Sequence, residues 1–169
     1  MTAPVVIFAV GNPSRGDDAI GPECCGQLAK WLENESLSDQ FELIEDFQLQ
    51  IEHALDLQNR ELVLFIDAGE QTPTPFVFTQ IFPSTAASHT THALAPEAVL
   101  QVYRQTEGSA PPPAFVLCVR GEEFELGEPL TAAASQHCAA AMDLLMQLCR
   151  QRSPGAWAQQ QTVATPQVA

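Results

Sequence analysis

Apolar runs alternate with amphipathic stretches along the chain, and this alternation predicts a layered α/β fold. Three runs are continuous and rich in β-branched residues, which is typical of strands buried on both faces of a parallel sheet. They cover residues 4–10, 62–66 and 114–119. A shorter strand is expected over residues 41–45. An edge strand is expected over residues 76–82, because prolines flank that segment. We therefore predict a three-layer sandwich, in which helices cover both faces of a twisted, mostly parallel sheet with one edge strand free to run antiparallel.

Between the strands, apolar residues recur at helical spacing. The first helix is expected to begin near Ile20, with Asp17 or Asp18 as its cap and Pro22 in its first turn. A short helix is expected over residues 49–57. Its predicted apolar face consists of Ile51, Ala54 and Leu55.

Two more helices are predicted in the second half of the chain. Pro96 suits the first turn of one, and Thr131 suits the cap of a longer one. The core stripe of the longer helix is expected to be Ala134, Cys138, Ala141, Met142, Leu145, Leu148 and Cys149. From residue 153 onward polar residues, Pro and Ala follow no period. We therefore expect one α/β domain over residues 1–152 and a disordered tail over residues 153–169.

Composition narrows the classes of partner. The 169 residues carry 21 acidic and 7 basic side chains, and the net charge of −14 disfavours nucleic acid, because phosphate binding relies on clustered Lys and Arg. No run approaches the roughly 20 apolar residues of a membrane span, and the N-terminus lacks the features of a secretory signal. The five cysteines form no CxxC pair. Reduced, mostly buried thiols in a cytoplasmic protein without a membrane partner are therefore expected.

Candidate chemistry gathers where the predicted strands end, which is where ligands bind in open α/β sheets. The polar residues expected at this edge are Asp17, Asp18, Glu45, Asp46, Asp67, His89, His92, Arg120, Glu122 and Glu123. Two or three carboxylates and one imidazole suit a divalent metal such as zinc, nickel or manganese better than copper(I). Gly11 and Gly16 have the spacing of a phosphate-binding loop, but Asp17 stands where that loop needs its lysine.

Each member of this group also has a purely structural explanation. Asp17 can serve only as a helix cap, and Asp67 can satisfy loop amides. His53 and His137 are interpreted as core or surface histidines. Only the coincidence of these residues at one edge indicates a site.

The segment from Gly11 to Gly21 reads GNPSRGDDAIG directly after the first strand. This GN-x4-DD-x2-G pattern resembles the opening motif of the hydrogenase maturation endopeptidases, which trim the C-terminal extension of nickel–iron hydrogenase large subunits. The resemblance continues through Phe65-Ile-Asp-Ala, Thr91-His-Ala-Leu-Ala-Pro-Glu, Arg120-Gly121 and the last long helix, over about residues 4 to 150.

The resemblance implies a five-stranded α/β fold and an endopeptidase. It implies that Asp18, Asp67 and His92 contact nickel already loaded into the precursor, which would license cleavage. A divalent ion such as zinc, cadmium or nickel is expected at the same three residues. The expected partner is the large-subunit precursor, and the resemblance favours a monomer.

The chain departs from the family pattern in three places. Ser14 replaces a large apolar residue and Ala19 replaces a common glycine. The glycine-rich stretch after the second strand is replaced by residues 45–53, where Glu45, Asp46 and His53 are candidates for a supporting role only. Because that stretch is expected to help receive the substrate, the identity of the hydrogenase and of the cleaved bond stays open.

Two other functions compete with an endopeptidase. A signalling receiver domain also places paired acids after its first strand and an aspartate after its third, but it needs a lysine after the fifth, where this chain has Arg120 and Gly121. A non-catalytic nickel-sensing docking protein would use the same ligands without cleavage. Acyl-enzyme chemistry has little support, because no GxSxG motif or recognisable cysteine nucleophile is present.

Overall fold

A computed structural model of the chain describes residues 2–85 and 94–162. Its centre is a five-stranded sheet in the order β2-β1-β3-β5-β4. The strands are β1 (Val5–Val10), β2 (Phe41–Asp46), β3 (Leu62–Gly69), β4 (Phe76–Ile81) and β5 (Ala114–Arg120). All neighbouring strands run parallel except β4, which pairs antiparallel with β5 at one edge. The predicted architecture is therefore confirmed, including the edge strand between the prolines.

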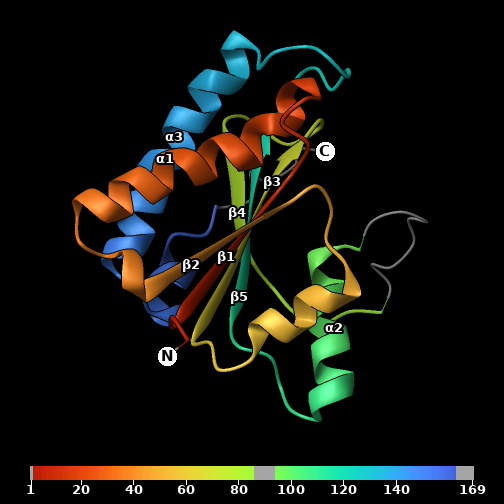
Figure 1. Ribbon diagram of the computed structural model, residues 1–169, viewed down its shortest axis with the longest axis vertical. Helices are drawn as coiled ribbons and strands as arrows, with labels where there is room; N and C mark the ends of the chain where they lie inside the picture. Colours follow the sequence, from red (N-terminus) through yellow and green to blue (C-terminus); the bar gives the residue numbers. More distant parts are fainter. Residues whose placement is uncertain (1, 86–93, 163–169) are drawn as a thin grey trace, which may run out of the picture.

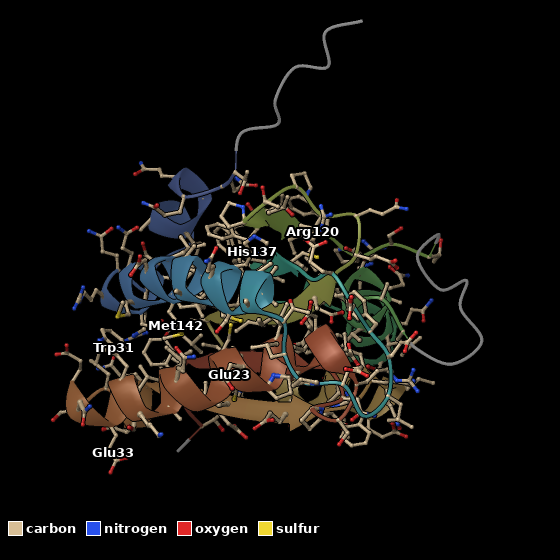
Figure 2. The ribbon with its side chains drawn as sticks, turned by 90° about the horizontal axis from the view of Figure 1, so that it is seen from above. Glu23, Trp31, Glu33, Arg120, His137 and Met142 are labelled. Atoms are coloured by element: carbon tan, nitrogen blue, oxygen red, sulfur yellow. The ribbon has the colours of Figure 1, made fainter. Side chains whose placement is uncertain are left out.

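Helices cover both faces of the sheet, as Figure 1 shows. One face carries α1 (Ile20–Asn34), α3 (Ala132–Arg150) and α4 (Pro154–Gln159), and the other carries α2 (Pro96–Glu107) and the 3₁₀ helix η3 (Ile51–Leu57). Two further 3₁₀ turns, η1 (Gly16–Ala19) and η2 (Ser38–Gln40), flank α1 in the sequence. On the first face α1 and α3 lie side by side (Figure 2). None of these helices is both long and apolar enough to span a membrane, within the residues that the structure describes.

The strands are buried because each face of the sheet has its own core cluster. Every residue of β1 is buried, as expected for a central parallel strand. The long helix begins as predicted, because the hydroxyl of Thr131 accepts a hydrogen bond from the backbone N–H of Ala134 at 3.1 Å. Its predicted core stripe is buried along its whole length.

The segment after β2 differs from the prediction. Residues 51–57 form a 3₁₀ helix, in which residues three apart share a face. Ala54 and Leu57 are accordingly buried, whereas Leu55 is 65% exposed. Ile51 is 62% exposed at the first position of this helix. The prediction that Ile51 and Leu55 face the core is therefore wrong, because the assumed α-helical spacing misplaced Leu55 and Ile51 lies at the exposed start of the helix.

The prediction of a disordered tail from residue 153 is wrong for residues 153–162. The indole of Trp157 is fully buried against Phe78 and Phe115, and its N–H donates to the carbonyl of Leu148 at 2.9 Å. Thr162 then exchanges hydrogen bonds with the backbone of Phe78. One large aromatic residue anchors a segment whose average composition is polar. The rest of the predicted tail, residues 163–169, lies outside the described residues.

Candidate functional site

The carboxyl ends of β1 and β3 meet at one edge of the sheet. Ala9 in β1 pairs with Ile66 in β3, so that the loop after β1 begins beside Asp67. Asp67 is still within β3 and pairs across the sheet with Cys118 of β5. Asp18 comes to the same edge on η1, and its charge acts on Asp67. The structure thus brings Asp18 and Asp67 together, as the strand-end argument predicts.

Two glycines of the first motif are required by close backbone packing. Gly11 has a φ of +148°, and a Cβ there would collide with the carbonyl of Asp18. A Cβ at Gly21 would collide with the carbonyl of Val10. The motif spacing therefore folds the loop back over the end of β1 and fixes the backbone that carries Asp18.

Asp18 is oriented by its own loop. One carboxylate oxygen, Oδ2, accepts a hydrogen bond from the backbone N–H of Asn12 at 2.8 Å. The side chain is partly exposed, so the carboxylate keeps acceptor capacity for a ligand at this edge.

Asp67 has the most perturbed carboxyl at the edge. Its pKa is raised from an ordinary value of 3.8 to about 7, mainly by burial and also by the negative charge of Asp18, against a lowering hydrogen bond from the N–H of Ala68. A carboxyl that is half ionised near neutral pH can hold or release a proton there, and an arriving cation would favour its ionised form.

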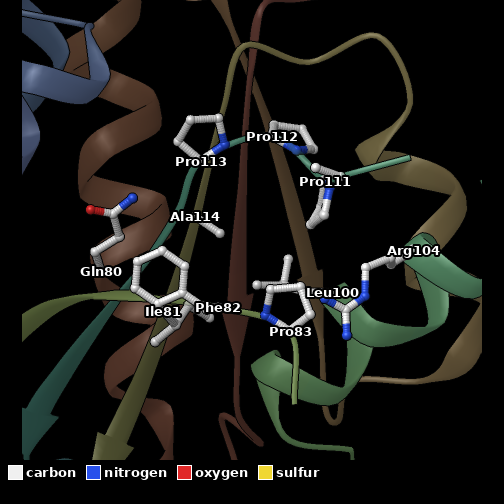
Figure 3. Close-up of a pocket in the computed structure, with 11 residues that line it drawn as sticks. Gln80, Ile81, Phe82, Pro83, Leu100, Arg104, Pro111, Pro112, Pro113 and Ala114 are labelled. Carbon is white, nitrogen blue, oxygen red and sulfur yellow. The ribbon is translucent and has the colours of Figure 1, made fainter. Parts of the chain in front are cut away.

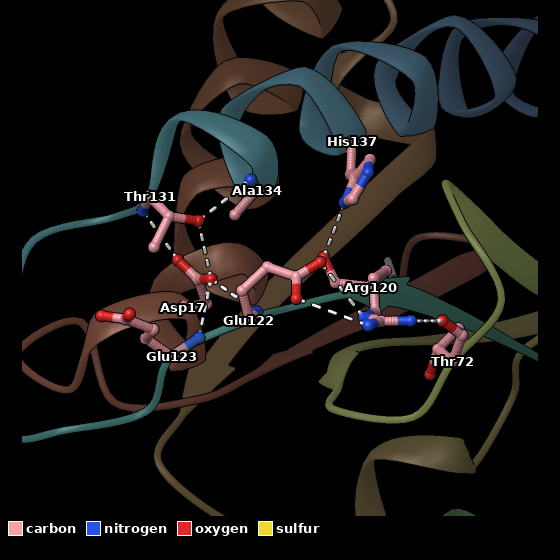
Figure 4. Close-up of polar contacts among 8 residues, drawn as sticks. All are labelled: Asp17, Thr72, Arg120, Glu122, Glu123, Thr131, Ala134 and His137. Carbon is pink, nitrogen blue, oxygen red and sulfur yellow. Dashed lines mark hydrogen bonds and ion pairs between the residues drawn. The ribbon is translucent and has the colours of Figure 1, made fainter.

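Asp17 has a different role from its neighbour. It is fully buried and accepts hydrogen bonds from the backbone N–H groups of Glu122, Glu123 and Thr131 and from the hydroxyl of Thr131 (Figure 4). Burial opposes ionisation, but these hydrogen bonds outweigh it and lower the pKa of Asp17. Asp17 therefore holds the loop between β5 and α3 against η1.

The prediction that Asp17 or Asp18 caps the first helix is wrong. The residue at the cap position of α1 is Ala19, which makes no capping side-chain bond. Both acids instead lie within η1, the 3₁₀ turn that precedes α1, and their carboxylates make the contacts described above.

His92 and His89 lie outside the described residues, so the third predicted ligand has no position here. Among the residues that the structure does describe, no group of three or more His, Cys, Asp or Glu side chains could hold a metal ion. The described part of the site therefore contains two of the three predicted ligands, Asp18 and Asp67.

The supporting candidates form a structural cluster beside the first loop. His53 is buried; its Nδ1 accepts from the N–H of Gln50 at 2.8 Å, and its Nε2 lies 3.4 Å from Oδ2 of Asp46. The ring also meets Phe8 edge to face. The backbone carbonyl of Asp46 in turn accepts a hydrogen bond from the N–H of Gly11. This agrees with the interpretation of His53 as a core histidine.

The other strand-end residues stabilise the loops. Nδ1 of His137 lies 3.0 Å from the carbonyl oxygen of Arg120. The guanidinium of Arg120 donates to the carbonyl of Thr72 at 3.0 Å and pairs with Glu122 (Figure 4). The turns after β3 and after β5 are thereby tied together beside the site.

Cys118 is a site neighbour that sequence reasoning missed. Its Sγ lies 3.1 Å from the hydroxyl oxygen of Thr72, and burial raises the pKa of the thiol, with Asp67 adding to that effect. Only the strand order places Cys118 next to Asp67, since 51 residues separate the two in the chain. The proximity of Cys118 to Asp67 could have been predicted only from the strand order and the register of β3 with β5, which the local sequence pattern does not give.

An acidic hollow of about 610 Å³ lies beyond the ends of β3 and β5. Its lining consists of Glu70, Glu122, Glu123, Phe124, Glu125 and Glu128. The hollow extends from the same sheet edge as Asp67, so the surroundings of the site are strongly negative.

Comparison with known proteins identifies the fold. No family model matches the sequence, and no curated protein does. Among solved structures, the hydrogenase maturating endopeptidase HybD from E. coli shares 21% identity over 88% of this chain and 93% of its own, with a TM-score of 0.66. The NiFe hydrogenase maturation protease HycI from Thermococcus kodakarensis KOD1 shares 20% over the same fractions, with a TM-score of 0.63. A structure described as the hydrogenase 3 maturation protease shares 18% over 95% of this chain and 98% of its own, also with a TM-score of 0.63.

The chain is therefore an α/β sandwich with two acids at the carboxyl edge of a mixed sheet. Its fold is that of the hydrogenase maturation proteases, as the first-loop motif led us to expect.

The receiver-domain alternative is ruled out by topology. Receiver domains have the flavodoxin-like strand order 2-1-3-4-5, all parallel. Here β5 lies inside the sheet and β4 runs antiparallel at the edge.

Proposed function

We propose that this chain is an endopeptidase that removes the C-terminal extension of a nickel–iron hydrogenase large-subunit precursor after nickel insertion. The observation that carries the proposal is the pair Asp18 and Asp67 at the carboxyl edge of a sheet with the maturation-protease fold. The proteins with similar structures are named as hydrogenase maturation endopeptidases or proteases, which supports a processing peptidase.

Nickel enters the proposal as part of the substrate. Asp18, Asp67 and His92 would contact it through two carboxylates and one imidazole, ligand types that nickel accepts. Resident metal sites of the zinc type have three or four protein ligands. Asp18, Asp67 and His92 would supply three, which leaves coordination positions open, so that a nickel ion held in part by the precursor's own ligands could complete its shell at these residues.

The chemistry would rest on Asp67. Contact with a cation favours the ionised carboxylate, so a nickel-loaded precursor would deprotonate Asp67. The resulting carboxylate could accept a proton from the water that attacks the scissile carbonyl, which is general base catalysis. A nickel-free precursor would leave Asp67 only about half ionised near neutral pH and would offer no metal for these residues to contact, and this would make metal loading the checkpoint.

Two surfaces beside the pair would receive the precursor. After β2, the side chains of Phe47 and Ile51 are 61% and 62% exposed, in the stretch that departs from the family pattern. The acidic hollow beyond β3 and β5 would attract a basic extension. Together these surfaces would select the hydrogenase that is processed.

The test is a cleavage assay with nickel-loaded and nickel-free precursor encoded in the same genome. Mass spectrometry of the product locates the cut. We expect cleavage of the nickel-loaded form only, and at least a hundredfold loss of rate in Asp18→Asn, Asp67→Asn and His92→Ala, on the scale of a lost acid–base group. Asp39→Asn, on η2 before β2, is the matched control and should retain full activity.

Full activity in any of the three site variants would overturn the residue assignment. Tight binding of the nickel-loaded precursor without any cleavage would instead indicate a nickel-sensing docking protein.

A further inference from the structure

A second hollow lies at the other end of the strands from Asp67, where β5 begins and β4 ends. Ala114 begins β5 and pairs with Ile81 at the end of β4, four residues before the Asp67–Cys118 pair. Between these strand ends and α2 is a pocket of about 290 Å³, close to the lower limit of about 300 Å³ for small-molecule sites (Figure 3). Its lining is Gln80, Ile81, Phe82, Pro83, Leu100, Arg104, Ala110, Pro111, Pro112, Pro113 and Ala114.

The walls of this pocket are apolar and stiff. Pro111, Pro112 and Pro113 have fixed φ angles and no backbone N–H, so they can line an apolar space without leaving a donor unsatisfied. Pro113 is fastened to the sheet, because its carbonyl accepts the N–H of Val63 at 3.0 Å. Leu100 is buried, and Phe82 is 65% exposed. A rigid, preformed pocket costs little to organise when a ligand enters.

The charge of the pocket is opposite to that of the molecule. The chain has three acidic residues for each basic one, yet among the described residues that line the pocket none is a carboxylate and Arg104 is the single charged side chain. The guanidinium of Arg104 donates to Oε1 of Gln101 at 2.6 Å and has no ion-pair partner in the described part of the chain. Guanidinium has five N–H donors, so several remain for an anion.

We propose that this pocket binds a small carboxylate with an apolar body. The hydrocarbon part would pack against Leu100, Phe82 and the three prolines, and the carboxylate would pair with Arg104. The site lies away from Asp18 and Asp67 and does not depend on the proposed peptidase activity.

The test is an NMR titration of the full ¹⁵N-labelled chain with 3-phenylpropionate, its neutral amide and 3-phenylpropylamine. We expect saturable shifts centred on the amides of Gln80, Leu100 and Ala114. The carboxylate should bind up to about fivefold more tightly than the amide, the scale of an exposed ion pair, and more tightly still than the amine. This preference should shrink in 1 M salt, where exposed charges are screened.

Arg104→Gln should bind acid and amide equally, because only the ion pair is lost. The matched control is Arg150→Gln on α3, which should keep the wild-type preference. Equal binding of acid and amine by the wild type, shifts centred elsewhere, or an unchanged preference in Arg104→Gln would each overturn the proposal.

Discussion

Asp17 binds Thr131 through both oxygens of its carboxylate. The backbone N–H of Thr131 donates to Oδ1 and its hydroxyl donates to Oδ2, each at 2.8 Å. The same hydroxyl accepts the N–H of Ala134 in the first turn of α3. A single buried acid therefore connects the loop that carries Asp18 to the start of the longest helix.

Replacing Asp17 by Asn should destabilise the protein by about 2–4 kcal/mol, because an amide NH₂ would face buried donors that now bind a carboxylate. Urea unfolding measures the change. The control is Asp143→Asn on the exposed side of α3, which should cost less than about 0.5 kcal/mol. A loss in Asp17→Asn as small as in the control would contradict the role given to this carboxylate.

The contribution of Asp17 to the free energy of unfolding should depend on pH. Its pKa is lower in the folded protein than its ordinary value of 3.8, so the stabilisation is fully present above that value and is lost as the pH falls through the folded pKa. The unfolding free energies of wild type and Asp17→Asn should therefore begin to converge as the pH falls below 3.8. A constant difference between them from pH 7 to pH 2.5 would show that the shift is absent.

Asp67 should have the opposite effect on stability. Its pKa is raised to about 7, so the folded state binds the extra proton between pH 4 and pH 7 and stability falls as the pH rises through that window. Asp67→Asn removes this titration and should flatten the dependence of the unfolding free energy on pH. The change in unfolding free energy between pH 4 and pH 8 should differ between the two proteins by on the order of 2–4 kcal/mol. Thermal unfolding at both pH values would reveal it; parallel profiles for the two proteins would contradict it.

Trp157 should be essential to the C-terminal segment. Trp157→Ala removes a fully buried indole, its two aromatic contacts and its hydrogen bond to Leu148, and should cost about 3–5 kcal/mol. Trp31→Ala is the comparison, because that indole is partly exposed and packs beneath Arg150. Equal losses in urea unfolding would mean that the segment after α3 adds nothing to the core.

The exposed side chain of Phe47 should matter for substrate rather than for folding. Phe47→Ser should leave the unfolding free energy within about 0.5 kcal/mol and raise KM for the precursor severalfold, since surface apolar groups act through docking. Phe82→Ser, an equally exposed phenylalanine at the far edge of the sheet, is the control for KM. An unchanged KM in Phe47→Ser would exclude this residue from the docking surface.

The strands were predictable because buried strands have a recognisable local sequence pattern. Continuous β-branched runs and flanking prolines depend only on neighbouring residues. The proximity of Asp18 to Asp67 followed from a general rule of parallel sheets.

The division of labour between Asp17 and Asp18 was not predictable. The two acids are adjacent in the chain, but their roles differ because of a loop more than a hundred residues away. This loop donates four hydrogen bonds to Asp17 and none to Asp18. The position of Cys118 beside Asp67 likewise required the strand order, and the helix around Trp157 depended on one side chain within a polar segment.

The contact between the C-terminal segment and β4 also bears on self-association. The outward-facing N–H groups of Phe78 and Gln80 are taken by side-chain oxygens of Thr162 and Gln161. An open strand edge is a template for pairing with another molecule. Because these donors are already occupied, a second copy that tried to extend the sheet at β4 would have to displace Gln161 and Thr162 first, and colloidal stability at high concentration would then depend on these two residues staying in place.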